Sequence, residues 1–140
     1  MPNPGPASTQ TVNFQPVNNQ QALVLIAAIK GLSVSSAGDV AVPLVGPISA
    51  FVPTTVLTTN ANVSMATATV GIYTAPGQGG TAVLTTAALT GQTSNSFAYV
   101  RAATAAAAQV TPISNVLYVN VGTTVAGGTV DLYLYGYNVS

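Results

Sequence analysis

Hydrophobic and polar residues alternate with a period of two along several short stretches of the chain, as they do in a β-strand with one buried face. Residues 66–74, 115–121 and 129–138 alternate most regularly. In the last of these the two predicted faces are Val130, Leu132 and Leu134 on one side and Asp131, Tyr133, Tyr135 and Tyr137 on the other. Further strand-like runs, rich in β-branched residues, are predicted at 23–29, 40–45, 54–59, 81–84 and 96–101.

Turn-forming residues separate these runs and fix the fold class that we expect. The stretch Pro76–Gly80 reads PGQGG and predicts a hairpin tip, Asn60–Asn62 predicts a turn, and Gly127-Gly128 precedes the last strand. Short strands at this spacing are typical of an all-β protein built as an antiparallel sandwich. We therefore predict a jelly-roll-like β-sandwich of about eight strands, with the strand order, jelly roll or immunoglobulin-like, left open.

Two stretches depart from this pattern. Residues 101–109 contain six alanines, which favour a helix by propensity, but the stretch is short and Thr104 interrupts it. We expect a strand or irregular chain there, with a short helix as the alternative. Residues 1–21 contain four prolines and many polar residues, so we predict an extended N-terminal arm followed by one sandwich domain over 22–140. A terminus without fixed structure is the alternative for this segment.

Charge is the property that most limits the function. Lys30, Arg101, Asp39 and Asp131 are the only charged side chains in 140 residues, and the chain has no His, Cys or Trp. Two basic residues make no phosphate-binding patch, so we expect no nucleic-acid partner and no attachment to an anionic membrane. Without Cys or His, and with two carboxylates, no ordinary metal, haem or iron–sulfur site is expected.

Candidate catalytic groups are few, and each has a simpler interpretation. A glycosidase would need Asp39 and Asp131 to meet across a cleft, whereas the sequence places one beside a turn and the other on a strand. A nucleophilic Ser or Thr would need Lys30 as its base, and no motif supports that pair. The glycines at 77–80 lack the Lys-Ser or Lys-Thr of a phosphate loop. We expect no enzyme, no cofactor and no small-molecule substrate.

Two sets of residues are candidates for binding a partner. Tyr133, Tyr135 and Tyr137 lie at a spacing of two and predict an aromatic row on one strand face. Such a row binds a sugar or another protein, or it packs against neighbouring strands inside the domain or an oligomer. In the arm, the apolar side chains that could anchor it on a neighbouring subunit are Val12, Phe14 and Val17.

A nearly uncharged chain must present a surface of hydroxyl, amide and apolar groups. Desolvating these groups costs less than desolvating ions, so the surface suits burial against another subunit. The stretch Val40–Leu84 and the closing run Thr129–Val139 resemble small, charge-poor structural proteins of tailed bacteriophages. The likeness covers most of residues 22–139 and is one of general composition and patterning.

This resemblance implies a capsid decoration, or cement, protein. Such proteins form trimers on the outside of the virion and clamp neighbouring copies of the major capsid protein. The arm at 1–21 would then reach along the capsid or to an adjacent decoration protein. A head-fibre, tail or receptor-binding module that recognises a host glycan is the first alternative, and a secreted pilus or matrix subunit is the second.

Overall fold

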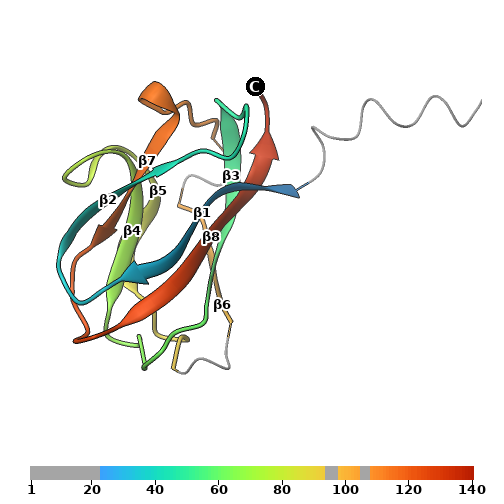
Figure 1. The fold of residues 1–140 in the computed structure, drawn as a ribbon. Coiled ribbons are helices and arrows are strands. Elements are labelled where there is room, and N and C mark those ends of the chain that lie inside the picture. The colour runs from blue at the N-terminus through green and yellow to red at the C-terminus, as the bar shows by residue number, and fades with distance from the viewer. Residues whose placement is uncertain (1–22, 94–97, 105–107) are drawn as a thin grey trace, which may run out of the picture.

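Two four-stranded antiparallel sheets packed face to face form the described part of the molecule (Figure 1). The structure is a computed structural model, and it describes residues 23–93, 98–104 and 108–140. The strands in chain order are β1 (Leu23–Ser33), β2 (Gly38–Pro43), β3 (Phe51–Thr59), β4 (Thr69–Ala75), β5 (Gly79–Ala88), β6 (Tyr99–Ala102), β7 (Val116–Val121) and β8 (Thr129–Asn138). A single 3₁₀ turn, η3 (Ile113–Asn115), precedes β7. The predicted antiparallel β-sandwich of about eight strands is confirmed.

The strand order is that of a jelly roll. Sheet A has the order β1-β8-β3-β6, and sheet B has the order β2-β7-β4-β5. Within them β1 pairs with β8, β2 with β7, β3 with β6 and β4 with β5, so the chain runs as one long hairpin with antiparallel halves. Rolling up this hairpin adds the β3–β8 and β4–β7 pairs. The two sheets of an eight-stranded jelly roll arise in this way.

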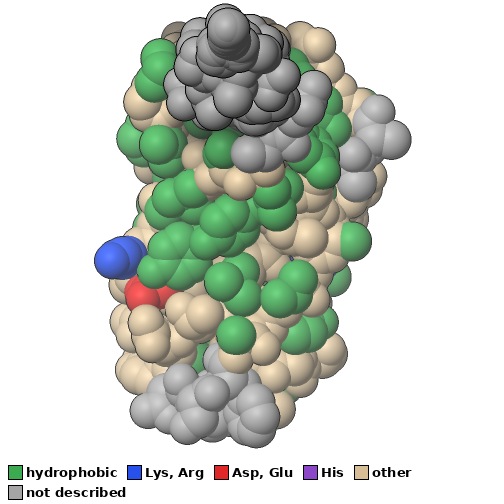
Figure 2. Space-filling model, turned by 90° about the vertical axis from the view of Figure 1, so that its right-hand side faces the viewer, with side chains coloured by type: hydrophobic (Ala, Val, Ile, Leu, Met, Phe, Trp, Pro, Cys, Tyr) green, Lys and Arg blue, Asp and Glu red, His purple; other side chains and the backbone are tan. Residues whose placement is uncertain are grey.

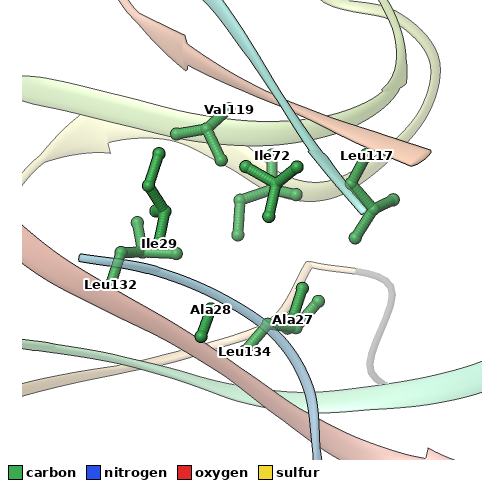
Figure 3. Close-up of a pocket in the computed structure, with 9 residues that line it drawn as sticks. Ala27, Ala28, Ile29, Ile72, Leu117, Val119, Leu132 and Leu134 are labelled. Carbon is green, nitrogen blue, oxygen red and sulfur yellow. The ribbon is translucent and has the colours of Figure 1, made fainter. Parts of the chain in front are cut away.

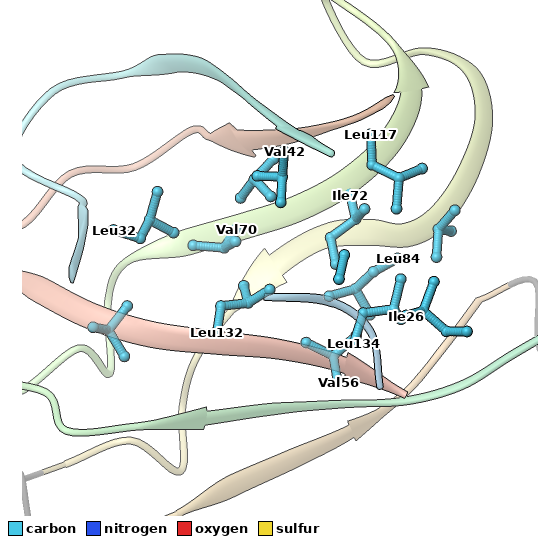
Figure 4. Packing of buried hydrophobic residues seen from close by; sticks show 14 of the residues in the cluster. Ile26, Leu32, Val42, Val56, Val70, Ile72, Leu84, Leu117, Leu132 and Leu134 are labelled. Carbon is cyan, nitrogen blue, oxygen red and sulfur yellow. The ribbon is translucent and has the colours of Figure 1, made fainter. Parts of the chain in front are cut away.

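The core lies between the two sheets and is filled by the inward side of each alternating strand (Figure 4). Val130, Leu132 and Leu134 of β8 are at most 2% exposed and face Val119 and other inward residues of sheet B. Phe51, at the start of β3, is fully buried. The faces predicted from the alternation in 115–121 and 129–138 are therefore those that the structure has. Burying such side chains is the main stabilising contribution to a fold without disulfides.

The ends of the elements differ from the prediction where the chain bulges. β1 runs on past the predicted end at Ile29 as far as Ser33, because a register shift between Ile29 and Leu32 accommodates Gly31 in the left-handed region. Pro53 lies inside β3, a strand with neighbours on both sides, but β6 pairs with β3 only from Thr55 onward. The missing proline N–H therefore leaves no ladder bond unmade at that point.

Residues 101–109 contain no helix in the part that the structure describes. Strand β6 ends at Ala102, and Ala103, Thr104 and residues 108–109 are irregular or turn. Residues 105–107 lie outside the described chain, as do residues 1–22. The predicted arm at 1–21 and its anchors Val12, Phe14 and Val17 therefore stay predictions.

Candidate functional site

The three tyrosines predicted as a row lie on the outer face of sheet A. They alternate with the buried residues of β8, which is an inner strand of that sheet, between β1 and β3. Tyr133 and Tyr135 are partly exposed, and Tyr137 is 39% exposed. The row therefore belongs to the surface of the described domain and not to its core. Both sequence-based interpretations, a row that binds a sugar or another protein and a row that packs against neighbouring strands inside the domain or an oligomer, stay predictions.

The residues beside the tyrosines turn the row into an apolar surface. Residues paired across neighbouring strands point to the same side of a sheet, so each tyrosine has one partner on β1 and one on β3. These partners are Ala28 and Leu57 for Tyr133, Leu25 and Thr55 for Tyr135, and Leu23 and Val52 for Tyr137. Five of the six are aliphatic. Val100 of β6, paired with Leu57, extends the surface and is 58% exposed.

We call this surface the tyrosine face and define it by its uncharged members: Leu23, Leu25, Ala28, Val52, Thr55, Leu57, Val100, Tyr133, Tyr135 and Tyr137. Figure 2 looks onto the side of the molecule where β3, β8 and β6 lie in Figure 1, and it shows hydrophobic side chains gathered across its middle. Charged atoms appear only at the margin of that view. Contiguous exposed apolar surface of this kind marks an interaction site in soluble proteins.

Asp131 and Lys30 mark the charged end of the tyrosine face. The Asp131 carboxylate accepts hydrogen bonds from the Asn60 side-chain amide at 2.9 Å and from the Gly31 backbone N–H at 2.7 Å. These two bonds, with a smaller contribution from the positive charge of Lys30, lower the pKa of Asp131 below its usual value. The carboxylate thus binds the β1 bulge at Gly31 on one side of β8 and the turn at Asn60 on the other.

On the outer face of sheet B, polar side chains bind the tip of the β4–β5 hairpin by hydrogen bonds. Asp39 on β2 accepts hydrogen bonds from the Asn120 amide at 2.9 Å and from the Gly77 backbone N–H at 2.7 Å. Asn120 in turn accepts one from the Gln78 amide at 3.0 Å. The two bonds to the carboxylate, that from Asn120 first, lower the pKa of Asp39. The glycine-rich hairpin tip is therefore held against β2 and β7 by hydrogen bonds.

Arg101 links the two sheets at one side of the sandwich by hydrogen bonds. It comes from β6, the edge strand of sheet A, and donates to the backbone carbonyls of Val70 at 3.2 Å, Thr85 at 3.1 Å and Ala87 at 3.3 Å. These carbonyls lie in β4 and β5, where a register shift between Val70 and Ile72 disturbs the ladder. The guanidinium therefore binds backbone oxygens of the opposite sheet and joins the two sheets.

A small pocket lies on the opposite side, between edge strands β1 and β2 (Figure 3). Its lining is wholly apolar: Ala27, Ala28, Ile29, Val42, Ile72, Leu117, Val119, Leu132 and Leu134. A ligand site normally adds a few polar groups that orient the ligand, and this pocket offers none. It is a gap at the margin of the core and carries no chemistry.

The two carboxylates lie on opposite outer faces of the sandwich. Asp39 lies on the outer face of sheet B and Asp131 on that of sheet A, so the two carboxylates do not share a cleft. Lys30 is exposed at the rim of the tyrosine face. Among residues 23–93, 98–104 and 108–140, no three metal-ligating side chains lie together. The described elements also include no helix long and apolar enough to cross a membrane.

Sequence reasoning found the tyrosines but missed the residues on β1, β3 and β6 that complete the surface. These residues carry no motif. Only the strand order shows that Leu23, Leu25 and Val52 flank β8 and that Val100 lies one strand further out, beside β3. The arm anchors fall outside the described residues. Comparison of the chain with models of known protein families, with curated proteins and with solved structures finds no match.

Proposed function

We propose that the chain is a structural subunit of a phage virion that decorates the outside of the capsid. In this proposal it binds across neighbouring copies of the major capsid protein as a homotrimer and stabilises the mature shell. It performs no catalysis and needs no cofactor. The similarity to phage structural proteins in composition and patterning supports the virion, and the surface of the described domain supports a role in assembly.

The observation that carries the proposal is the tyrosine face. It is an uncharged surface on four hydrogen-bonded strands, with Leu23 at 51%, Val100 at 58% and Tyr137 at 39% exposure. Such side chains stay in contact with water at a cost unless another surface covers them. Tyr is among the residues that contribute most to protein interfaces, because it buries a large area and loses little conformational freedom.

Decoration in this form works by contact area. A subunit that binds only the mature lattice stabilises that lattice by mass action, by an amount that grows with the ratio of its concentration to its dissociation constant. The contact needs no ionic steering, and a surface without charges adds no ion desolvation. Three copies in one trimer would engage several seams at once, so their individual affinities combine through high effective concentration.

The geometry favours a protein partner over a host glycan. A sugar site combines aromatic rings with polar groups placed to meet the hydroxyls. Around the tyrosines, Thr55 is the one polar cross-strand partner among six. Glycan recognition by a head-fibre, tail or receptor-binding module, and assembly into a secreted pilus or matrix, therefore stand behind capsid decoration. Copy number separates decoration, with hundreds of copies per particle, from a fibre or tail, with a handful.

A binding experiment with purified capsids tests the proposal. Capsids of the encoding phage that lack this chain would be titrated with purified protein between 50 mM and 1 M NaCl. We expect saturable binding whose affinity changes by less than about threefold, because few charges are available for screening. Tyr137→Lys should weaken binding by about 30-fold or more, which is the loss of about 2 kcal/mol typical of an interface anchor.

The matched control is Ala41→Lys, which places the same charge on exposed β2, in the other sheet. This variant should bind like the unmodified chain. Release of the protein by moderate salt, or equal losses from the two lysine variants, would count against an apolar attachment through the tyrosine face. Absence of any binding to the capsid would reject the proposed function.

A further inference from the structure

The tyrosine face begins where the described chain begins. Leu23 is the first described residue, and its side chain is itself part of the face, paired with Tyr137. Twenty-two residues precede it in the sequence, and none of them is charged. Their large apolar side chains beyond Met1 are Val12, Phe14 and Val17, all within six residues. An uncharged segment with clustered apolar anchors is thus tethered at the margin of an uncharged apolar face.

The length of residues 12–17 matches the length of the tyrosine row on β8. Residues 12–17 span about 20 Å when extended, at about 3.3 Å per residue. The outward row of β8, from Tyr133 to Tyr137 and on to Val139, runs over about the same length. Val139 continues the row, since its N–H bonds to the Ala50 carbonyl across from it, and it is 43% exposed. An extended segment of this size can therefore cover the row from end to end.

A second copy of the face would cover it less well. Four strands about 4.8 Å apart and about 23 Å long present roughly 400 Å² in plan, about half of the area that each partner of a stable complex usually buries. Two faces pressed together would therefore make a small interface. A segment that extends from one domain onto the next adds its own buried area and tolerates variable spacing between domains.

From these observations we propose that the tyrosine face binds residues 12–17 of a second copy of this chain, so that neighbouring copies are linked by exchanged arms. This inference rests on the proposed function, in which several copies lie side by side. It places the arm of a neighbouring copy, and not the capsid protein itself, on the tyrosine face, so Tyr137→Lys would weaken capsid attachment by unlinking copies whose affinities otherwise combine. In an extended segment Val12 and Phe14 point to the same side, so Phe14 meets the exposed ring of Tyr137 and Val12 lies against the aliphatic residues of β1 and β3. The contact is apolar and adds no ion desolvation.

Site-specific cross-linking of the full-length chain tests this pairing, because the sequence has no native cysteine. Gln15→Cys places a thiol beside Phe14 while keeping all three anchors. Val100→Cys places one on the exposed edge of the tyrosine face while keeping the tyrosines. The two variants would be purified separately, mixed and treated with a bismaleimide whose spacer spans about 16 Å, the distance of two strands and four residues that separates Val100 from Tyr137. We expect a cross-linked dimer of unlike chains to form at least about tenfold faster than with Ala41→Cys, on sheet B, in place of Val100→Cys.

Two further variants make the result specific. Adding Tyr137→Lys to the Val100→Cys chain should reduce the rate to that of the Ala41→Cys control. A chain carrying both Gln15→Cys and Val100→Cys should cross-link between molecules, in proportion to its concentration. Equal rates for the two acceptor positions would overturn the inference. So would predominant Val100→Cys homodimers, or cross-linking within single chains at every concentration. Capsid attachment is measured separately, so these failures leave the proposed function standing.

Discussion

At the scale of single residues, the two carboxylates perform the same structural task in different sheets. Asp39 and Asp131 each accept one hydrogen bond from a glycine backbone N–H and one from an asparagine side-chain amide. Bonds to a charged acceptor are stronger than those between neutral groups, so each carboxylate holds a loop against its strand. The sequence predicted a turn for Asp39 and a strand face for Asp131. It could not predict their partners, which are 38 to 100 residues away.

These bonds determine how stability responds to acid. The pKa values of Asp39 and Asp131 are lower in the folded chain than their ordinary value, near 3.9 in an unfolded chain. The stabilisation is therefore fully present above about pH 5 and is lost as the pH falls through the lowered values. We expect a thermal midpoint that is flat from pH 8 to 5 and falls below about pH 4, as measured by circular dichroism.

The double variant Asp39→Asn with Asp131→Asn isolates this effect. It should be less stable at pH 7, because an amide cannot accept both bonds, and its midpoint should change little down to pH 3. Lys30→Ala is the matched control, since it removes a charge without removing either pair of bonds. An acid-induced loss in the double variant as large as in the unmodified chain would show that other groups are responsible.

At the scale of elements, alternation predicted β4, β7 and β8, and runs rich in β-branched residues predicted the other five strands. The differences lie at the bulges, such as the extension of β1 through Gly31, where the period of two is interrupted. Arg101 shows the limit of local patterns. It stands on the inward side of short β6, opposite buried Val56, and its three acceptors become available only because β5 bulges against β4.

Removing the Arg101 guanidinium should therefore loosen the junction of β6 with β4 and β5. We expect Arg101→Ala to lower the free energy of unfolding by about 2 kcal/mol, the usual cost of losing hydrogen bonds to a charged donor. Arg101→Lys should recover part of it, since a single ammonium cannot reach three carbonyls in the same geometry. Urea unfolding measures the free energy of unfolding of both variants, and we expect its dependence on urea concentration to keep the same slope.

The other cation supplies the control. Lys30→Ala removes an exposed charge and should change the free energy of unfolding by less than about 0.5 kcal/mol. If Arg101→Ala were as mild as Lys30→Ala, the bonds between the sheets would contribute little to stability. The side of the sandwich would then be held by Thr104, whose backbone N–H bonds to the Val83 carbonyl at 2.8 Å.

At the scale of the whole molecule, the sandwich was predictable and its strand order was not. The spacing of strands and turns indicates two packed sheets, but the β1–β8 pair joins residues about 100 positions apart and leaves no local mark in the sequence. The tyrosine face depends on that order. Tyr133, Tyr135 and Tyr137 could be found from β8 alone, whereas Leu25 and Val52 become part of the same surface only when β1 and β3 close around it.

In the proposed function the domain acts through its surface. Its few charges hold loops and edges, and its broad uncharged face is left for a partner. In such an interface, specificity for a partner comes from shape complementarity and apolar contact, whereas charge complementarity supplies it in many other interfaces. The proposed role as a virion subunit is therefore tested in the assembled particle.

The most direct measurement is therefore a cryo-electron microscopy map of virions from the phage that encodes the chain. We predict many symmetric copies on the outer capsid surface, grouped in threes, with Tyr133, Tyr135 and Tyr137 covered by protein density. A map in which the chain is absent from the capsid, or sits there with its tyrosine face open to solvent, would contradict the central claim.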